Sequence, residues 1–136
     1  MSYQNAFIRV AADCPAPIAA IPLPRGGKQT VASLQFNLLQ RFPYTLTEEE
    51  LLLKVFLLQR QIPEKDSRSH PAVLEFLAKP KPCLRASPLP KQFGWGVHYD
   101  AEGRIAIFAR ESAEYAELSR SEKLQQLMAL RNKRER

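Results

Sequence analysis

Several classes of protein are excluded by what this chain of 136 residues lacks. Its two cysteines, Cys14 and Cys83, form no CxxC pair, and no apolar segment opens the chain. These absences predict a reduced, cytoplasmic protein rather than a secreted one held by disulfides. The densest apolar run, residues 51–58, is interrupted by Lys54 and is far shorter than the roughly 20 residues that cross a bilayer. The sequence therefore predicts no contact with a membrane.

Signatures of catalysis and of nucleotide binding are also missing. The chain contains no GxxxxGK[ST], GxGxxG or GxSxG motif, which mark phosphate-binding loops, dinucleotide-binding folds and α/β hydrolases. A metal site would have to gather four residues that stand alone in the sequence, namely Cys14, His70, Cys83 and His98. We therefore expect neither a metal nor a cofactor.

The net charge of +6 raises the question of a nucleic-acid partner, but it is unevenly distributed. The last six residues, 131–136, hold four bases and one acid and so carry half of the net charge. Proteins that bind nucleic acid usually have a basic stripe with interleaved aromatic residues, whereas the charges before residue 131 are mixed. We expect one domain over residues 1–136 with a basic tail at 131–136 that is a candidate for disorder. Nucleic-acid binding through the basic surface and tail is the lowest-ranked function.

A β-hairpin is the clearest local structure in the sequence. The tetrapeptide Asp100-Ala101-Glu102-Gly103 has Asp at the first turn position and Gly where a positive φ is needed. This turn predicts pairs from Asp100 with Arg104 down to Gly96 with Phe108. One face of the hairpin is then apolar and must be covered by helices. Its residues are Trp95, Val97, Tyr99, Ile105, Ile107 and Ala109.

The other face of the hairpin is thin. It carries Gly94, Gly96, His98 and Ala106, and Phe108 is expected to lie across Gly96. Glycines here either relieve crowding in a packed core around Trp95 or admit a loop, a ligand or a second subunit close to the backbone.

The remaining elements predict an α+β fold, with a small antiparallel sheet of about three strands covered by helices. The N-terminal strand at 6–12 joins the hairpin, and Thr47 with Glu50 predicts a capping box at a helix start. Proline-rich segments at 14–24 and 79–91 predict extended connections. Further helices are predicted at 29–42, at 71–78 with Val73, Leu74, Phe76 and Leu77 inward, and at 121–131 with Leu124, Leu127 and Met128 inward.

Three short elements, RASPLPK, GWG and GRIA, accompany the opening MSYQNAFIRVAADCP and the segment PRGGKQTVASLQ. On these elements the chain resembles, over nearly its whole length, a family of small uncharacterised bacterial proteins that share a conserved domain of unknown function. The resemblance implies no activity.

Five basic residues form the candidate ligand site. Arg25 and Lys28 flank two glycines before a helix, Arg85 and Lys91 lie in the second proline-rich segment, and His98 lies on the thin face of the hairpin. If these loops meet above that face, the five side chains would bind a small anion through guanidinium, ammonium and backbone groups. The alternative is that they are scattered surface charges without a function.

The sequence thus favours a non-catalytic binding or interaction module for a small anionic ligand or a protein partner. A small enzyme is the main alternative, with His98 as the base for a Cys83 or Ser87 nucleophile. A homodimer is also predicted, because residues 51–58 are apolar around most of a helix. That helix, or an exposed sheet edge, would form the interface unless the helices at 29–42 and 71–78 cover it.

Overall fold

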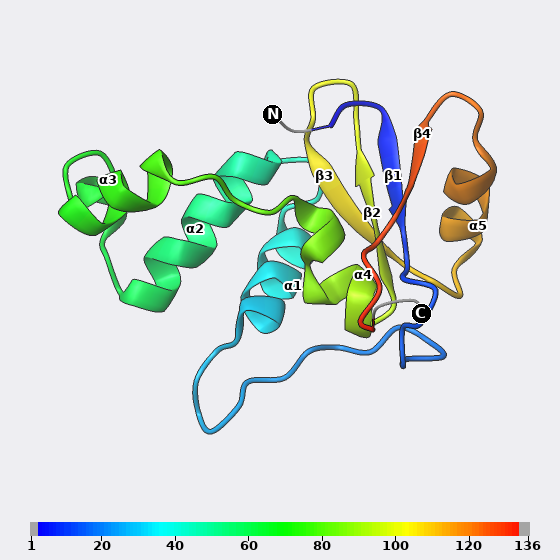
Figure 1. The fold of residues 1–136 in the computed structure, drawn as a ribbon, viewed down its shortest axis with the longest axis horizontal. Coiled ribbons are helices and arrows are strands. Elements are labelled where there is room, and N and C mark those ends of the chain that lie inside the picture. The colour runs from blue at the N-terminus through cyan, green and yellow to red at the C-terminus, as the bar shows by residue number, and fades with distance from the viewer. Residues whose placement is uncertain (1–2, 134–136) are drawn as a thin grey trace.

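The computed structural model describes residues 3–133, which form one sheet with helices on both faces (Figure 1). The strands are β1 (Ala6–Arg9), β2 (Trp95–Tyr99), β3 (Ile105–Ala109) and β4 (Gln125–Met128). Their order is β3-β2-β1-β4; β2 is antiparallel to both neighbours, whereas β4 is parallel to β1. The α+β class is confirmed, and the sheet in the described part has four strands rather than about three.

The helix predicted at 121–131 is wrong, because this segment supplies β4. Its leucine spacing suits a helix, but the free edge of β1 offers unpaired backbone groups that a strand can satisfy. The Gln125 amide donates to the Asn5 carbonyl at 2.9 Å, and the Ala129 amide donates to the Arg9 carbonyl at 2.9 Å. The Arg9 guanidinium also donates to the Gln126 side chain at 3.0 Å, which fixes the register.

The hairpin prediction is confirmed residue by residue. Tyr99 pairs with Ile105 and Gly96 with Phe108, and Gly103 has a φ of 78°. The Asp100 carboxylate accepts hydrogen bonds from the amides of Glu102 and Arg104 at 3.0 and 2.8 Å, so its side chain closes the turn.

The apolar face of the hairpin packs against α1 (Val31–Arg41), α2 (Glu48–Arg60) and α4 (Pro88–Gln92). Phe36 of α1 lies with its ring centroid 5.1 Å from that of Trp95. The predicted capping box at the start of α2 is present, with the Thr47 amide donating to Glu50 and the Glu50 amide donating to Thr47. The main core therefore lies on this side of the sheet.

The second proline-rich segment is not extended, contrary to the prediction. It forms a 3-10 turn, η2 (Leu84–Ala86), followed by α4. Ser87 caps α4 by accepting from the Leu89 amide at 3.1 Å, and Pro88 occupies the first helical turn, where no amide donor is needed. Burial of Leu84 and Leu89 in the core favours this folded form over an extended one.

The thin face is covered by α5 (Ala113–Arg120), whose Tyr115 lies against Phe7 of β1 with ring centroids 5.1 Å apart. A Cβ placed on Gly96 would lie 2.6 Å from the Phe7 ring and 2.7 Å from the Tyr115 ring. The glycine therefore relieves crowding, as one of the two interpretations held, but around Phe7 and Tyr115 rather than around Trp95.

Residues 48–78 form an arm that begins on the core and extends away from the sheet, at the left of Figure 1. It consists of α2, the 3-10 turn η1 (Glu64–Asp66) and α3 (Pro71–Ala78). His70 caps α3, since its Nδ1 accepts from the Ala72 amide at 3.1 Å. Within residues 3–133 the helices are all too short or too polar to cross a membrane.

Candidate functional site

The first two residues of the predicted anion site lie in a tight turn on the long connection between β1 and α1. Arg25 and Lys28 exchange two backbone hydrogen bonds of 2.8 and 3.0 Å, and Gly26 and Gly27 between them have φ values of 57° and 77°. This geometry is a two-residue hairpin turn. The glycines are thus explained by their backbone conformation, and the turn stands at the tip of an exposed loop (Figure 1).

The sheet separates His98 from the other two predicted ligands. Lys91 belongs to α4, which packs on the face that carries Val97 and Tyr99, whereas His98 alternates with those residues and points to the opposite face. Arg85 donates from Nε to the Met128 carbonyl at 2.6 Å. The structure therefore does not bring the five bases together above the thin face, because the loop expected to reach that face folds as η2 and α4 on the core side.

His98 instead lies beside Tyr44, whose hydroxyl is 2.7 Å from the His98 Nδ1. Burial lowers the pKa of His98, and the nearby Asp100 carboxylate opposes that shift. Burial also raises the pKa of Tyr44, with a further contribution from Asp100. Both side chains are thus kept neutral near pH 7, which suits a structural hydrogen bond.

The two nucleophiles proposed for an enzyme are held by other partners. Ser87 is buried, and its hydroxyl donates to the Gln35 side chain at 2.6 Å while capping α4. The Cys83 sulfur accepts from the Tyr3 hydroxyl at 3.6 Å. Among the described residues, neither nucleophile has a hydrogen bond to His98, so neither predicted dyad is assembled.

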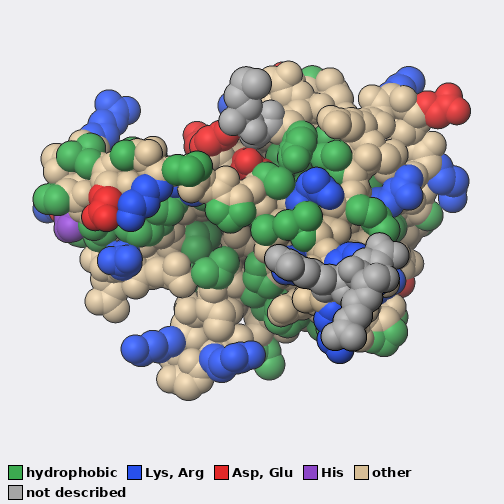
Figure 2. Space-filling model, viewed as in Figure 1, with side chains coloured by type: hydrophobic (Ala, Val, Ile, Leu, Met, Phe, Trp, Pro, Cys, Tyr) green, Lys and Arg blue, Asp and Glu red, His purple; other side chains and the backbone are tan. Residues whose placement is uncertain are grey.

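The basic residues do not form one continuous surface in the view of Figure 2. Lys and Arg side chains are spread over that face, and hydrophobic side chains lie both on the arm at the left and across the middle of the face. In the predicted tail, Asn132 is tied to Asp13 by hydrogen bonds of 2.9 to 3.2 Å. Residues 134–136 lie outside the described part of the chain.

The arm carries two exposed leucines on one helix. Leu74 and Leu77 are 52% and 53% exposed, although both were predicted to point inward. They lie three residues apart and so occupy one side of α3, which we call the α3 face. Val73 and Phe76, on the other side, are buried and half-buried. An eight-residue helix cannot turn four apolar positions of this spacing toward a single neighbour.

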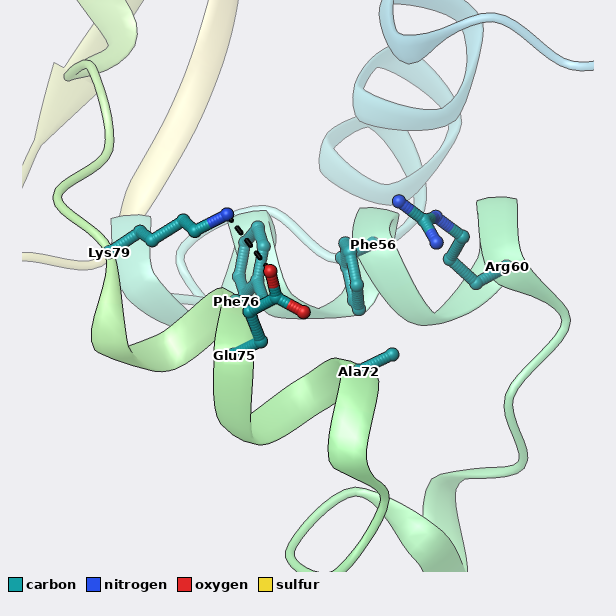
Figure 3. A pocket seen from close by; sticks show the side chains of 6 residues that line it. All are labelled: Phe56, Arg60, Ala72, Glu75, Phe76 and Lys79. Carbon is teal, nitrogen blue, oxygen red and sulfur yellow. Dashed lines mark hydrogen bonds and ion pairs between the residues drawn. The ribbon is translucent and has the colours of Figure 1, made fainter.

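Contact with α3 also explains why α2 does not need a partner of its own. Phe56 of α2 and Phe76 of α3 stack with ring centroids 4.3 Å apart, and Arg60 covers the other side of Phe56 (Figure 3). Of the apolar run at 51–58, Leu58 is exposed, whereas the others are buried or half-buried. Neighbouring helices therefore cover most of this run within one chain, and α3 in turn exposes Leu74 and Leu77.

A groove of about 540 Å³ runs beside the α3 face. Leu77 forms one side, Leu46 and Leu53 form apolar parts of the wall, and Lys54 makes a 3.2 Å ion pair with Glu64 across the polar part. An apolar ridge next to a partly apolar groove is the shape expected of a protein-binding surface.

A family model matches residues 1–135 and is described as a family of unknown function, DUF6157. The chain belongs to DUF6157. No curated protein and no solved structure matches it. Membership of this family therefore assigns no activity to the chain.

The short elements on which the resemblance was based have structural roles in this DUF6157 protein. RASPLPK forms η2 and α4, and GRIA holds the turn glycine Gly103 and the start of β3. In GWG, Gly94 has a φ of 81°, the Trp95 indole donates to the Ala20 carbonyl at 2.8 Å, and Gly96 makes room for two aromatic rings. These elements therefore stabilise the fold, and their presence in the sequence does not indicate a functional site.

Proposed function

We propose that this protein is a non-catalytic interaction module that self-associates through the α3 face. The observation that carries the proposal is the pair of half-exposed leucines, Leu74 and Leu77, side by side on a helix that stands away from the sheet. When a partner covers these leucines, the removal of their apolar surface from water stabilises the complex by roughly 25 cal/mol per Å² of buried area. Isolated exposed leucines need no explanation, but clustered ones mark binding surfaces.

The charges around the α3 face favour a second copy of the chain as the partner. The protein has a net charge of +6, so most surfaces of two copies repel each other. The groove beside Leu77, however, is lined by two acids, Glu50 and Glu64, and by two bases, Lys54 and Arg68, so it is locally neutral. Two α3 helices packed antiparallel about a two-fold axis would place the leucines of each copy against those of the other. Such a surface is complementary to itself, as a symmetric dimer requires.

The groove beside the α3 face adds area to this interface. Leucines of one copy would enter the groove next to Leu77 of the other, and a stable interface needs about 800 Å² per partner. Two leucines alone fall short of that area, so the walls formed by Leu46 and Leu53 are part of the proposal.

The test is light scattering over a range of micromolar concentrations. We expect the mass to approach twice the 15.5 kDa of one chain, and a Leu74→Glu or Leu77→Glu variant to return to one chain while keeping its circular dichroism spectrum. The matched control is Leu23→Glu, because Leu23 is 74% exposed but lies in the proline-rich connection. The control should remain dimeric. A wild type of one-chain mass, or a Leu74→Glu protein that is folded and dimeric, would overturn the proposal.

A further inference from the structure

A second site lies where the start of α2 meets the end of α3 and the segment before η2. A pocket of about 250 Å³ opens there, lined on its apolar side by Leu52, Phe76 and Leu77. Glu48 and Cys83 supply its polar wall. It contains none of the predicted ligand residues, and it shares only Leu77 with the α3 face.

The carboxylate of Glu48 is the unusual group in this pocket. The residue is 5% exposed, which is rare for a glutamate, since burying a carboxylate is costly unless donors satisfy it. Its Oε1 accepts from the Tyr99 hydroxyl at 2.6 Å and from the Leu84 amide at 3.1 Å. Among residues 3–133 no group donates to its Oε2. The carboxylate is thus fixed in place by one oxygen and has capacity for a further donor at the other.

The phenol of Tyr99 cannot serve as a competing acid or base. Burial raises the pKa of Tyr99, and its hydrogen bond to Glu48 raises it further, so the phenol remains a proton donor to the carboxylate. Tyr3 likewise donates to Cys83, and this hydrogen bond and burial raise the pKa of Tyr3. The wall of the pocket therefore presents the Glu48 carboxylate as a hydrogen-bond acceptor that Tyr99 and Leu84 hold in place.

The charge balance of the lining favours a cationic group. Glu48 and Glu49 are acids, and Lys81 is the base. Lys81 pairs with neither acid among residues 3–133, because its Nζ lies 4.4 Å from the centre of the Phe76 ring and donates to the Lys79 carbonyl. Two acids against one base leave the lining with a negative balance. A charge-assisted hydrogen bond from an ammonium group to the Glu48 carboxylate would be among the stronger polar contacts available to a ligand.

We infer that this pocket binds a small amphipathic amine, with its ammonium group against Glu48 and its apolar body against Leu52, Phe76 and Leu77. Cys83 would then lie beside the bound molecule. A pocket of this size admits a small molecule and not a peptide, and a few polar groups on an apolar wall are the usual composition of such sites. The sequence predicted an anionic ligand, whereas this ligand is a cation. The difference arises because Glu48, interpreted from the sequence as an acid at a helix start, lies in the wall of the pocket.

The test uses phenethylamine as the probe, with phenethyl alcohol and hydrocinnamic acid as ligands of matched size and different charge. Each is titrated into the isotope-labelled full chain carrying Leu74→Glu, and amide shifts are followed by NMR. Leu74 does not line the pocket, and its substitution should hold the protein as a monomer. We expect saturable shifts at the amides of Lys81, Cys83 and Leu84, with the amine tightest. Glu48→Gln should weaken the amine about tenfold through loss of a charged hydrogen bond, while its amide still accepts from Tyr99 and Leu84. Glu49→Gln, at the exposed rim, is the matched control and should change affinity little.

A second readout needs no variant. Alkylation of Cys83 by iodoacetamide should slow about threefold when the amine is present at about twice its Kd, by mass action. Cys14 in the same protein should react at an unchanged rate, since it does not line the pocket. Absence of saturable shifts, equal affinity for the amine and the acid, or equal protection of both thiols would each overturn the inference.

Discussion

The substitution Gly96→Ala tests the packing of the second face of the sheet. A Cβ at this position would lie 2.6 Å from Cζ of Phe7 and 2.7 Å from Cε2 of Tyr115, distances well inside van der Waals contact. Neither ring can withdraw easily, because Phe7 is fully buried and the Tyr115 hydroxyl accepts a 2.9 Å hydrogen bond from the Val10 amide. Overpacking of this kind costs about 1–3 kcal/mol.

The opposing term is the entropy that an alanine saves in the unfolded chain, about 0.5–1 kcal/mol. We therefore expect Gly96→Ala to lower the free energy of unfolding by about 1–2 kcal/mol, measured by urea denaturation with an unchanged m-value. In a double-mutant cycle with Tyr115→Leu, the removal of one ring should recover part of the loss and give a favourable coupling energy. A Gly96→Ala protein as stable as the wild type would refute the close packing of Phe7 and Tyr115 on Gly96. If the stability changes of the two substitutions simply add, the new methyl group does not contact Tyr115.

Two further substitutions test the hairpin turn and the buried carboxylate. Gly103→Ala should lower the free energy of unfolding by about 1 kcal/mol in the same assay, because φ at Gly103 is 78° and alanine is strained there; unchanged stability would contradict this turn. Tyr99→Phe should cost about 1–3 kcal/mol by removing one donor from Glu48. The pKa of Tyr99 is raised in the folded state, so its contribution is complete below the ordinary tyrosine pKa of about 10 and is lost as pH rises above it. The loss of wild-type stability above that pH should be steeper than in Tyr99→Phe, and parallel curves would contradict the assignment.

The elements that could be predicted are those specified by nearby residues. In the hairpin, Asp100 and Gly103 determine the turn and the turn determines the register. Thr47 and Glu50 set the start of α2 in the same local way. Such elements carry their information within a few positions, so a single sequence suffices.

The errors arose where distant contacts decide the local structure. Residues 121–131 have helical spacing of their apolar side chains, but pairing with β1, more than a hundred positions away, makes 125–128 a strand. Prolines at 88 and 90 suggested an extended loop, whereas burial of Leu89 against the sheet selects a helix. As a result, Arg85 and Lys91 lie on the core side of the sheet, whereas His98 points to the opposite face.

The candidate sites were harder to predict because neither has a sequence motif. The α3 face is visible only once Val73 and Phe76 are known to pack inward, which leaves Leu74 and Leu77 outside. Glu48 had an adequate explanation as an acid at a helix start, and its link to Tyr99 joins residues far apart in the chain. Both features result from tertiary packing.

The most direct test of the proposed function is an isotope-filtered NOE experiment on a mixture of labelled and unlabelled chains. The filter retains only signals that pass between two copies. Self-association through the α3 face predicts cross-peaks from the methyl groups of Leu74 and Leu77 to the α3 helix of the other copy. Cross-peaks that arise instead from Leu58, from the sheet edges or from the proline-rich connection would contradict it. The absence of any cross-peak between copies would contradict it as well.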